Sequence, residues 1–254
     1  MKEERVELFE KLLDCVGNIN IKINMYKQHP DLPPIDIYQR IWHYYSLPKF
    51  LSLLSSSSLY LCRQDKFDDG FEGAMTKKDE AFFESKVSGI TKGMKGDSLG
   101  CTYSNCWTKS DLDEYVLWSS YATLQDGVAI QSTVNGLITA LDPEDKRPVY
   151  VSNVQYIDYE KDYSFRLTRG KANMIAPHFS KRPYFEAEKE LRAMYWDTNG
   201  RFNNTPEGLL FKVDLNVLIE TVYVAPYSMP QYRDVIEELM MKYDLNKEVK
   251  ESGI

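Results

Sequence analysis

The amino-acid sequence predicts an α+β fold with a mixed or split β-sheet and short peripheral helices. At least six short stretches are rich in the aromatic and β-branched residues of strands, and the helical stretches between them are few and short. The sequence contains no glycine-rich phosphate loop of the P-loop or dinucleotide-binding type. We therefore do not expect a doubly wound parallel sheet, and a bound nucleotide would be held in another way.

Composition and charge narrow the class of protein. The 254 residues are 43% hydrophobic and 13% aromatic, which is ample for a packed core. A formal net charge of -7 argues against a surface that holds nucleic acid by bulk attraction, although a local basic patch is compatible with it. No apolar run reaches membrane-spanning length, and the start MKEERVELFEKLL is too charged for a signal peptide. We expect a cytoplasmic protein that does not bind membranes, and the sequence does not predict an oligomeric state.

The chain divides into two expected parts. Residues 3–16 carry apolar side chains at helical spacing, and residues 27–36 form a proline-rich, extended connector. The domain organisation predicted is therefore an N-terminal helix and connector over 1–36 and a single α+β domain over 37–254. The apolar residues of the first helix are Val6, Phe9, Leu12, Leu13 and Val16.

The domain is expected to open with a compact strand, helix and strand unit. Its elements are a strand in 37–47, a helix at 48–56 with Pro48 in its first position, a strand at 58–63, an acidic turn at 66–73, a helix through about residue 87 and a glycine-rich loop at 88–100. Further strands are predicted at 101–108, 126–133, 149–157, 208–215 and 220–226. Two more helices are predicted at 110–122, with Leu112, Tyr115, Val116 and Tyr121 as its apolar positions, and at about 229–243, with Tyr232, Val235, Leu239 and Tyr243 on one stripe.

The stretch FEAEKELRAMYWD at 185–197 is also predicted to be a strand. Because side chains alternate along a strand, Glu186, Glu188, Glu190 and Arg192 would share one face. A solvated edge strand with paired charges is one interpretation of this pattern. An acidic catalytic or ligand-binding cleft is the other.

Four short motifs follow one another along the chain. They are WHY at 42–44, FDDGFE at 67–72, WSSYATLQDG at 118–127 and EKELR at 188–192. With the stretches at 222–243 and 248–254, they resemble the family of uncharacterised bacterial domains called DUF2971, over roughly residues 38–254. The family pattern has Asn and Pro where this chain has Asp68 and Gly70, and His where it has Gln125, so a role for that histidine is not carried over.

The order of features is also similar to that of ADP-ribosyltransferase folds, in which a first strand carries His or Arg and a late strand carries the catalytic Glu. The stretch 42–61 is particularly like the opening of the DNA-modifying branch. The resemblance implies an NAD-dependent enzyme that transfers ADP-ribose to a macromolecule or hydrolyses NAD, and a role as a bacterial toxin or in anti-phage defence fits such chemistry. The expected partners are a nucleotide ligand and a nucleic acid or protein acceptor.

Such a reaction passes through an oxocarbenium-like state, which a nearby carboxylate stabilises. We expect Glu190 first and Glu188 second to be catalytic, and His43 to bond the ribose or a phosphate. The expected cofactor-binding residues are Tyr44, Asp69, Glu72, Trp118, Tyr121 and Arg192. A basic segment at 166–182, with Arg166, Arg169, Lys171, Lys181 and Arg182, is a further place for contact with phosphates.

Other interpretations of the same residues stay open. His43, Trp118 and Tyr121 also fit a hydrophobic core, and carboxylates such as Asp69 and Glu72 commonly cap helices. A non-catalytic nucleotide-sensing or protein-interaction module on the same fold is the main alternative function. A nuclease that uses Asp69, Glu72 and Glu188 with Mg²⁺ is another. Cys101 and Cys106 lack a second pair that would complete a zinc site, so no metal is expected.

Overall fold

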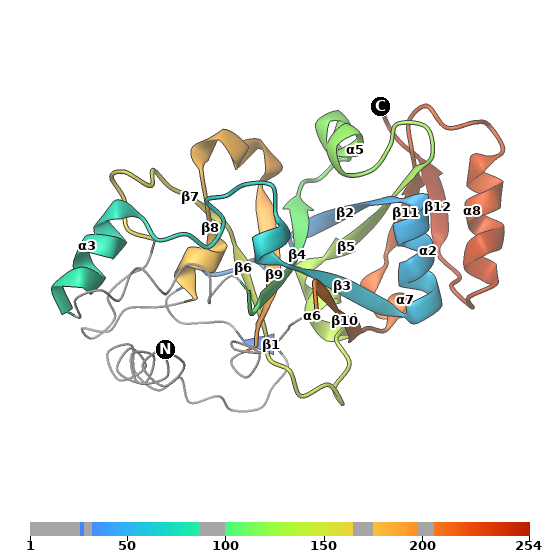
Figure 1. Ribbon diagram of the computed structural model, residues 1–254. Helices are drawn as coiled ribbons and strands as arrows, with labels where there is room; N and C mark the ends of the chain where they lie inside the picture. Colours follow the sequence, from blue (N-terminus) through green and yellow to red (C-terminus); the bar gives the residue numbers. More distant parts are fainter. Residues whose placement is uncertain (1–25, 28–31, 87–99, 165–174, 198–205) are drawn as a thin grey trace.

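A computed structural model describes residues 26–27, 32–86, 100–164, 175–197 and 206–254. Within these residues, ten strands form one sheet in the order β1-β6-β9-β4-β2-β5-β11-β12, with β3 paired to β4 and β10 paired to β3 (Figure 1). The strands are β1 (Tyr26–Lys27), β2 (Arg40–Ser46), β3 (Ser58–Arg63), β4 (Thr102–Lys109), β5 (Gly127–Thr133), β6 (Val149–Asn153), β9 (Glu190–Trp196), β10 (Gly208–Lys212), β11 (Thr221–Val224) and β12 (Glu248–Glu251). The pairs β1–β6 and β11–β12 are parallel and the others antiparallel, which confirms the predicted mixed sheet.

Short helices surround the sheet. They are α2 (Leu47–Ser56), α3 (Lys77–Lys86), α5 (Tyr115–Tyr121), α6 (Val134–Ala140), α7 (Leu215–Leu218) and α8 (Tyr232–Met241), together with the 3-10 helices η1 (Gln64–Lys66), η2 (Ala176–Phe179) and η3 (Pro183–Glu188). A separate parallel pair joins β7 (Gln155–Tyr156) to β8 (Ser180–Lys181). The predicted α+β class with short peripheral helices is confirmed. Within the described part of the chain, no helix has the length and apolar character needed to cross a membrane.

The sheet forks at β4. Along one edge, β4 pairs with β9 from Thr102 to Thr108, which is nearly its full length. On its other edge, the start of β4 pairs with β3 at Ser104, whereas its end pairs with β2 at Thr108. Residues 105–107 lie between these two pairings, and α2 connects the two arms of the fork. The sheet is therefore split, as the sequence predicts, and the split leaves room for a cavity.

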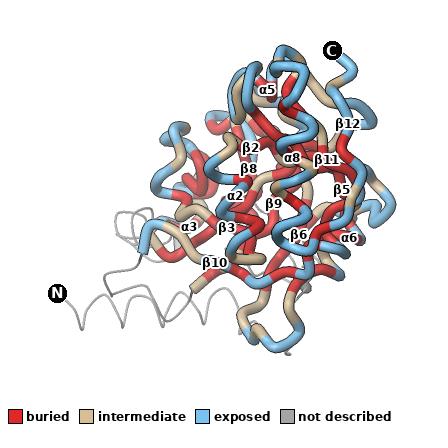
Figure 2. Tube along the Cα trace, turned by 90° about the vertical axis from the view of Figure 1, so that its right-hand side faces the viewer, coloured by how far each residue is buried: buried red, intermediate tan, exposed pale blue. Residues whose placement is uncertain are grey.

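Two apolar layers cover the two faces of the sheet. On one face, Leu191 and Ala193 of β9 pack with residues of α2 and α8 in the largest core cluster. On the other face, Met194 and Trp196 pack near Phe83 of α3. Side-chain alternation places Glu190 and Arg192 on this second face, the same face as Met194. The strands β5 and β9 are buried over nearly all their length, as the red segments in Figure 2 show.

The predicted strand at 185–197 is partly wrong. Residues 183–188 form the 3-10 helix η3, which begins at Pro183, where the fixed φ of proline favours helical backbone. Lys189 then adopts a left-handed conformation with φ 45°, and the strand begins only at Glu190. Glu186 and Glu188 therefore come from a helix, and only Glu190 and Arg192 share a strand face.

One predicted helix face is wrong and another is partly wrong. The helix α5 begins at Tyr115 and buries Leu117 and Trp118. The four residues predicted to be its apolar face are all exposed, and Leu112 is the most exposed of them at 74%. The helix α8 buries Tyr232, Ile236 and Met240. The predicted stripe is therefore right at Tyr232 and at Leu239, which packs against the core, and wrong at the exposed Val235 and Tyr243. The helices α6 and α7 and strand β12 were not predicted. The predictions for 3–16, 88–99 and 166–174 lie outside the described residues.

Candidate functional site

A cavity of about 600 Å³ occupies the fork of the sheet. It is lined by β2, α2, β3, the middle of β4, the turn after η1, the end of α5, Lys181 of β8, η3 and the first residue of β9. Seven of the nine predicted site residues line it, namely His43, Tyr44, Asp69, Glu72, Tyr121, Glu188 and Glu190. Arg192 and Trp118 are fully buried behind this lining.

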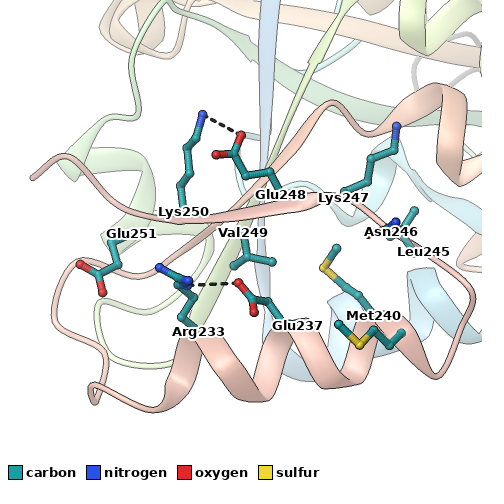
Figure 3. Close-up of a pocket in the computed structure, with 11 residues that line it drawn as sticks. Arg233, Glu237, Met240, Leu245, Asn246, Lys247, Glu248, Val249, Lys250 and Glu251 are labelled. Carbon is teal, nitrogen blue, oxygen red and sulfur yellow. Dashed lines mark hydrogen bonds and ion pairs between the residues drawn. The ribbon is translucent and has the colours of Figure 1, made fainter.

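A second hollow, of about 650 Å³, lies between α8 and β12 (Figure 3). Most of the residues that line it are charged, and four of them form ion pairs with one another. Arg233 binds Glu237 at 3.1 Å and Lys250 binds Glu248 at 3.0 Å, and all four side chains are at least one third exposed. Because exposed ion pairs of this kind are common on protein surfaces, the fork cavity is the better candidate site.

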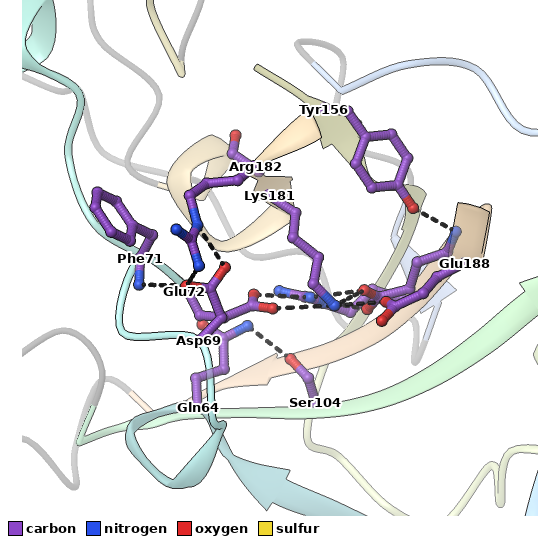
Figure 4. Close-up of polar contacts among 12 residues, drawn as sticks. Gln64, Asp69, Phe71, Glu72, Ser104, Tyr156, Lys181, Arg182 and Glu188 are labelled. Carbon is purple, nitrogen blue, oxygen red and sulfur yellow. Dashed lines mark hydrogen bonds and ion pairs between the residues drawn. The ribbon is translucent and has the colours of Figure 1, made fainter. Parts of the chain in front are cut away.

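Lys181 stands at the centre of a cluster of three carboxylates in the fork cavity (Figure 4). Its Nζ lies 2.5 Å from Glu188 Oε2 and 3.4 Å from both Glu190 Oε2 and Glu72 Oε1. Glu188 ends η3 and Glu190 begins β9, whereas Glu72 comes from the turn after η1, a distant part of the chain. The sequence placed Lys181 in a phosphate-binding segment, whereas its ammonium neutralises carboxylates of the chain itself.

Arg192 fixes the Glu190 carboxylate from behind. Its Nε and NH2 donate to the two oxygens of Glu190 at 2.7 and 3.0 Å. The same guanidinium lies 2.9 Å from Glu72 Oε2, and its NH1 donates to the His178 carbonyl at 2.6 Å. A buried bidentate pair of this kind holds the carboxylate in one orientation. Arg192 is thus a positioning residue beneath the cavity.

A further set of hydrogen bonds supports the cluster. Gln64 donates through Nε2 to Ser104 Oγ at 2.8 Å, and its Oε1 lies 2.6 Å from Nδ1 of the buried His178. The Glu190 backbone N–H donates to the Tyr156 hydroxyl at 2.8 Å, and Tyr121 donates through its hydroxyl to Glu188 Oε1 at 2.7 Å. The contacts of Tyr156 and Tyr121 hold Glu190 and Glu188 in place, while those of Gln64 orient His178, whose carbonyl binds Arg192.

The environments of Glu72 and Glu190 move their pKa values in opposite directions. Burial acts to raise the pKa of Glu190, but the charge and hydrogen bonds of Arg192 outweigh it and lower that pKa below its ordinary value. Burial raises the pKa of Glu72 despite the nearby Arg192. Glu190 is therefore ionised near neutral pH, and Glu72 is the carboxyl of the pair that takes up a proton first.

His43 reaches the same cavity from the opposite face of the sheet. Its Nδ1 lies 2.7 Å from the Cys106 carbonyl, and since a carbonyl only accepts, Nδ1 carries the proton. Burial lowers the pKa of His43 to about 4, so the ring is neutral at pH 7 and its Nε2 is an acceptor. Its ring lies 4.3 Å from that of Tyr45 and 5.1 Å from that of Trp107.

The aromatic pair Tyr44 and Trp118 has a structural role in the described contacts. The Tyr44 hydroxyl accepts from the Glu114 N–H at 3.0 Å, and Trp118 donates through Nε1 to Asp113 Oδ2 at 3.1 Å. The two rings meet edge to face at 5.1 Å. This packing favours the core interpretation of Trp118, while Tyr121, one helical turn further along α5, reaches the cavity.

The acidic turn is held by the chain's own cations. Asp69 pairs with Arg182 at 2.9 Å and accepts from the Phe71 N–H at 3.1 Å, which stabilises the turn. With Glu72 bound to Arg192 and Glu188 bound to Lys181, each carboxylate of the nuclease hypothesis faces a cation. Across the described ranges, no group of three or more His, Cys, Asp or Glu residues could hold a metal ion.

Comparisons with known proteins gave structural neighbours only. No protein-family model matches the chain, and a search of the curated proteins found no match. The chain is similar to the solved structure of Thermus sp. 2.9 DarT in complex with NAD+, with a TM-score of 0.41 and 8% identity over 86% of this chain and 97% of that chain. It is similar to the same protein in complex with carba-NAD+, at a TM-score of 0.40, 8% identity and coverages of 86% and 97%. It is also similar to the structure of the same protein in complex with ADP-ribosylated ssDNA, with a TM-score of 0.41 and 8% identity over 87% of this chain and 97% of that chain.

Proposed function

We propose that the chain is an ADP-ribosyltransferase-like enzyme that uses NAD as substrate and cleaves its nicotinamide–ribose bond in the fork cavity. The observation that carries the proposal is the Glu190 carboxylate, which is ionised, fixed by Arg192 and part of the cavity lining. The sequence motifs at 42–44 and 188–192 support it, because their residues meet at this cavity. Membership of the DUF2971 family stays a prediction.

Glu190 stabilises the positive charge that develops on the ribose. As the bond from C1′ to the pyridinium nitrogen breaks, its electron pair leaves with nicotinamide and the sugar becomes oxocarbenium-like. A preorganised carboxylate lowers this barrier without reorganising during the reaction. The 2′-hydroxyl of the ribose can donate to a Glu190 oxygen that Arg192 holds in place.

Glu188 serves the acceptor in this proposal. Its side chain is 19% exposed, more than that of Glu190 at 4%, and it is oriented by Lys181 and Tyr121. It can accept the proton of the attacking hydroxyl or amine while the new bond forms at C1′. With water in place of a macromolecule, the same steps release ADP-ribose. DNA and protein acceptors, and a role in toxicity or anti-phage defence, stay predictions.

A non-catalytic nucleotide sensor is the second candidate. It is favoured by the full pairing of both carboxylates: Arg192 engages both oxygens of Glu190, and Lys181 with Tyr121 engages both oxygens of Glu188. Such a module would bind the nucleotide without releasing nicotinamide.

Calorimetric titration of the full chain with NAD and with ADP-ribose tests the two candidates together. Nicotinamide release is followed in parallel by chromatography, on the wild type, on Glu190→Gln and on Glu237→Gln, whose carboxylate lies on α8 away from the cavity. Release that is lost only in Glu190→Gln supports the enzyme. Binding without release supports the sensor, and the absence of both binding and release rejects both.

A further inference from the structure

Three buried polar atoms in the wall of the fork cavity lack a hydrogen-bond partner. They are the Tyr45 hydroxyl, Asn105 Oδ1 and Trp107 Nε1. The three side chains are 6%, 5% and 1% exposed, and all three residues line the cavity. A buried donor or acceptor without a partner has given up its hydrogen bonds to water and replaced them with none, so three such atoms in one wall are unfavourable for folding.

The fork of the sheet explains why these atoms are grouped. Asn105 and Trp107 are two residues apart and share one face of β4, in the stretch between its pairings with β3 and β2. Tyr45 belongs to β2, and the His43 ring lies against both Tyr45 and Trp107. This wall contains neither Glu190 nor Arg192, which occupy the other face of the sheet.

The donors and acceptors of the wall have defined directions. Asn105 donates through Nδ2 to the Tyr60 carbonyl at 3.2 Å, which orients the amide and leaves Oδ1 as an acceptor. Trp107 Nε1 can only donate, and the Tyr45 hydroxyl can do either. A ligand that satisfies the wall must therefore present an acceptor and a donor close together, on a group flat enough to lie among aromatic rings.

We infer that this wall is a binding subsite for a flat heteroaromatic group that carries a hydrogen-bond donor and acceptor on one edge. A primary carboxamide on a pyridine ring and the amino edge of a purine both have this chemistry. The inference rests on the proposed function, because NAD carries both groups. Since the three atoms are closed off from water, a ring of the wall must shift on binding. The His43 ring contacts the rings of Tyr45 and Trp107 and is the neighbour that such a shift would involve.

Titration of the full chain with nicotinamide, nicotinic acid and adenosine tests the subsite. Tyr45→Phe removes only the unpaired hydroxyl, so it should leave the Tm unchanged or raise it while weakening the preferred ligand about tenfold. Trp107→Phe, which removes the unpaired N–H, should weaken the same ligand. The matched control is Tyr232→Phe on α8, whose hydroxyl donates to the Asp126 carbonyl at 2.5 Å: it should lower the Tm and leave the affinity unchanged.

The ligands distinguish the two sources of the group. If nicotinamide binds at least tenfold more tightly than nicotinic acid, the subsite recognises the carboxamide. If adenosine binds, the subsite recognises the purine. No binding of either, or equal affinity in the wild type, Tyr45→Phe and Trp107→Phe, overturns the inference.

The outcome is separable from that of the proposed function. If NAD cleavage depends on Glu190 but the KM for NAD is unchanged in Tyr45→Phe and Trp107→Phe, the subsite inference fails and the proposed enzyme function stands. If ligand binding depends on Tyr45 and Trp107 but the chain never releases nicotinamide, the subsite inference stands and the proposed enzyme function fails.

Discussion

Glu190 and Arg192, two residues apart on β9, are joined by two hydrogen bonds of 2.7 and 3.0 Å, and their side chains are 4% and 0% exposed. The pair is continuous with Glu72 and Lys181, so charges of both signs are buried together. Taking charges out of water is costly unless each has a partner. The cluster therefore makes the site sensitive to the loss of any one of its members.

Replacing Arg192 with methionine should destabilise the chain by roughly 3–5 kcal/mol, because Glu190 and Glu72 lose their shared cation while staying buried. Urea unfolding at pH 7 measures the change. Arg233→Met is the control, since its partner Glu237 is on an exposed helix surface, and it should cost less than about 1 kcal/mol. Equal losses in the two variants would contradict the importance of the buried cluster.

Lys181 and Glu188 should be energetically coupled. A double-mutant cycle with Lys181→Met and Glu188→Gln should give a coupling free energy of about 1–3 kcal/mol, because the pair is 2.5 Å apart and mostly buried. The exposed pair Lys250 and Glu248 provides the comparison and should couple by less than about 1 kcal/mol. Additive losses at Lys181 and Glu188 would show that the two charges do not interact.

His43 should make stability fall in mild acid. Its pKa is 6.5 when unfolded and about 4 when folded, so the unfolded chain binds a proton first as the pH drops. The contribution of neutral His43 to the free energy of unfolding is complete above pH 6.5 and is lost as the pH falls through about 4. At about 1.4 kcal/mol per pH unit, the total is roughly 3 kcal/mol.

Urea unfolding of the wild type and of His43→Gln at pH 7, 5.5 and 4 isolates this contribution, since the carboxylates titrate in both proteins. The wild type should lose more stability than the variant between pH 7 and pH 4. Parallel pH profiles would mean that His43 is not kept neutral by the fold.

The sequence identified most members of the site but not how they come together. The alternation of charges drew attention to Glu188 and Glu190, and the resemblance to ADP-ribosyltransferase folds implied their roles, yet η3 and the left-handed Lys189 place Glu188 outside the strand. Tyr121 was expected on α5, but on an apolar stripe that turned out to be exposed. Local patterns identify elements well, and they fail where a proline or a single positive φ changes the backbone within a few residues.

The central position of Lys181 could not be predicted from local pattern. It depends on β8 pairing with β7 and on Glu72, which is more than a hundred residues away in the chain. The unpaired atoms of Asn105 and Trp107 were also missed, because an ordinary strand sequence gives no sign that its neighbours diverge. Both features follow from long-range strand register, which a single sequence does not specify.

The rate of nicotinamide release from NAD by the wild type and by Glu190→Gln is the most direct test of the proposed function. The variant keeps the size of the side chain and removes its charge, so we expect release to fall by about 100- to 1000-fold. Circular dichroism and the Tm establish that the variant is folded. Release by a folded Glu190→Gln at the wild-type rate, or no release by the wild type, would contradict Glu190 as the carboxylate that stabilises the ribose cation.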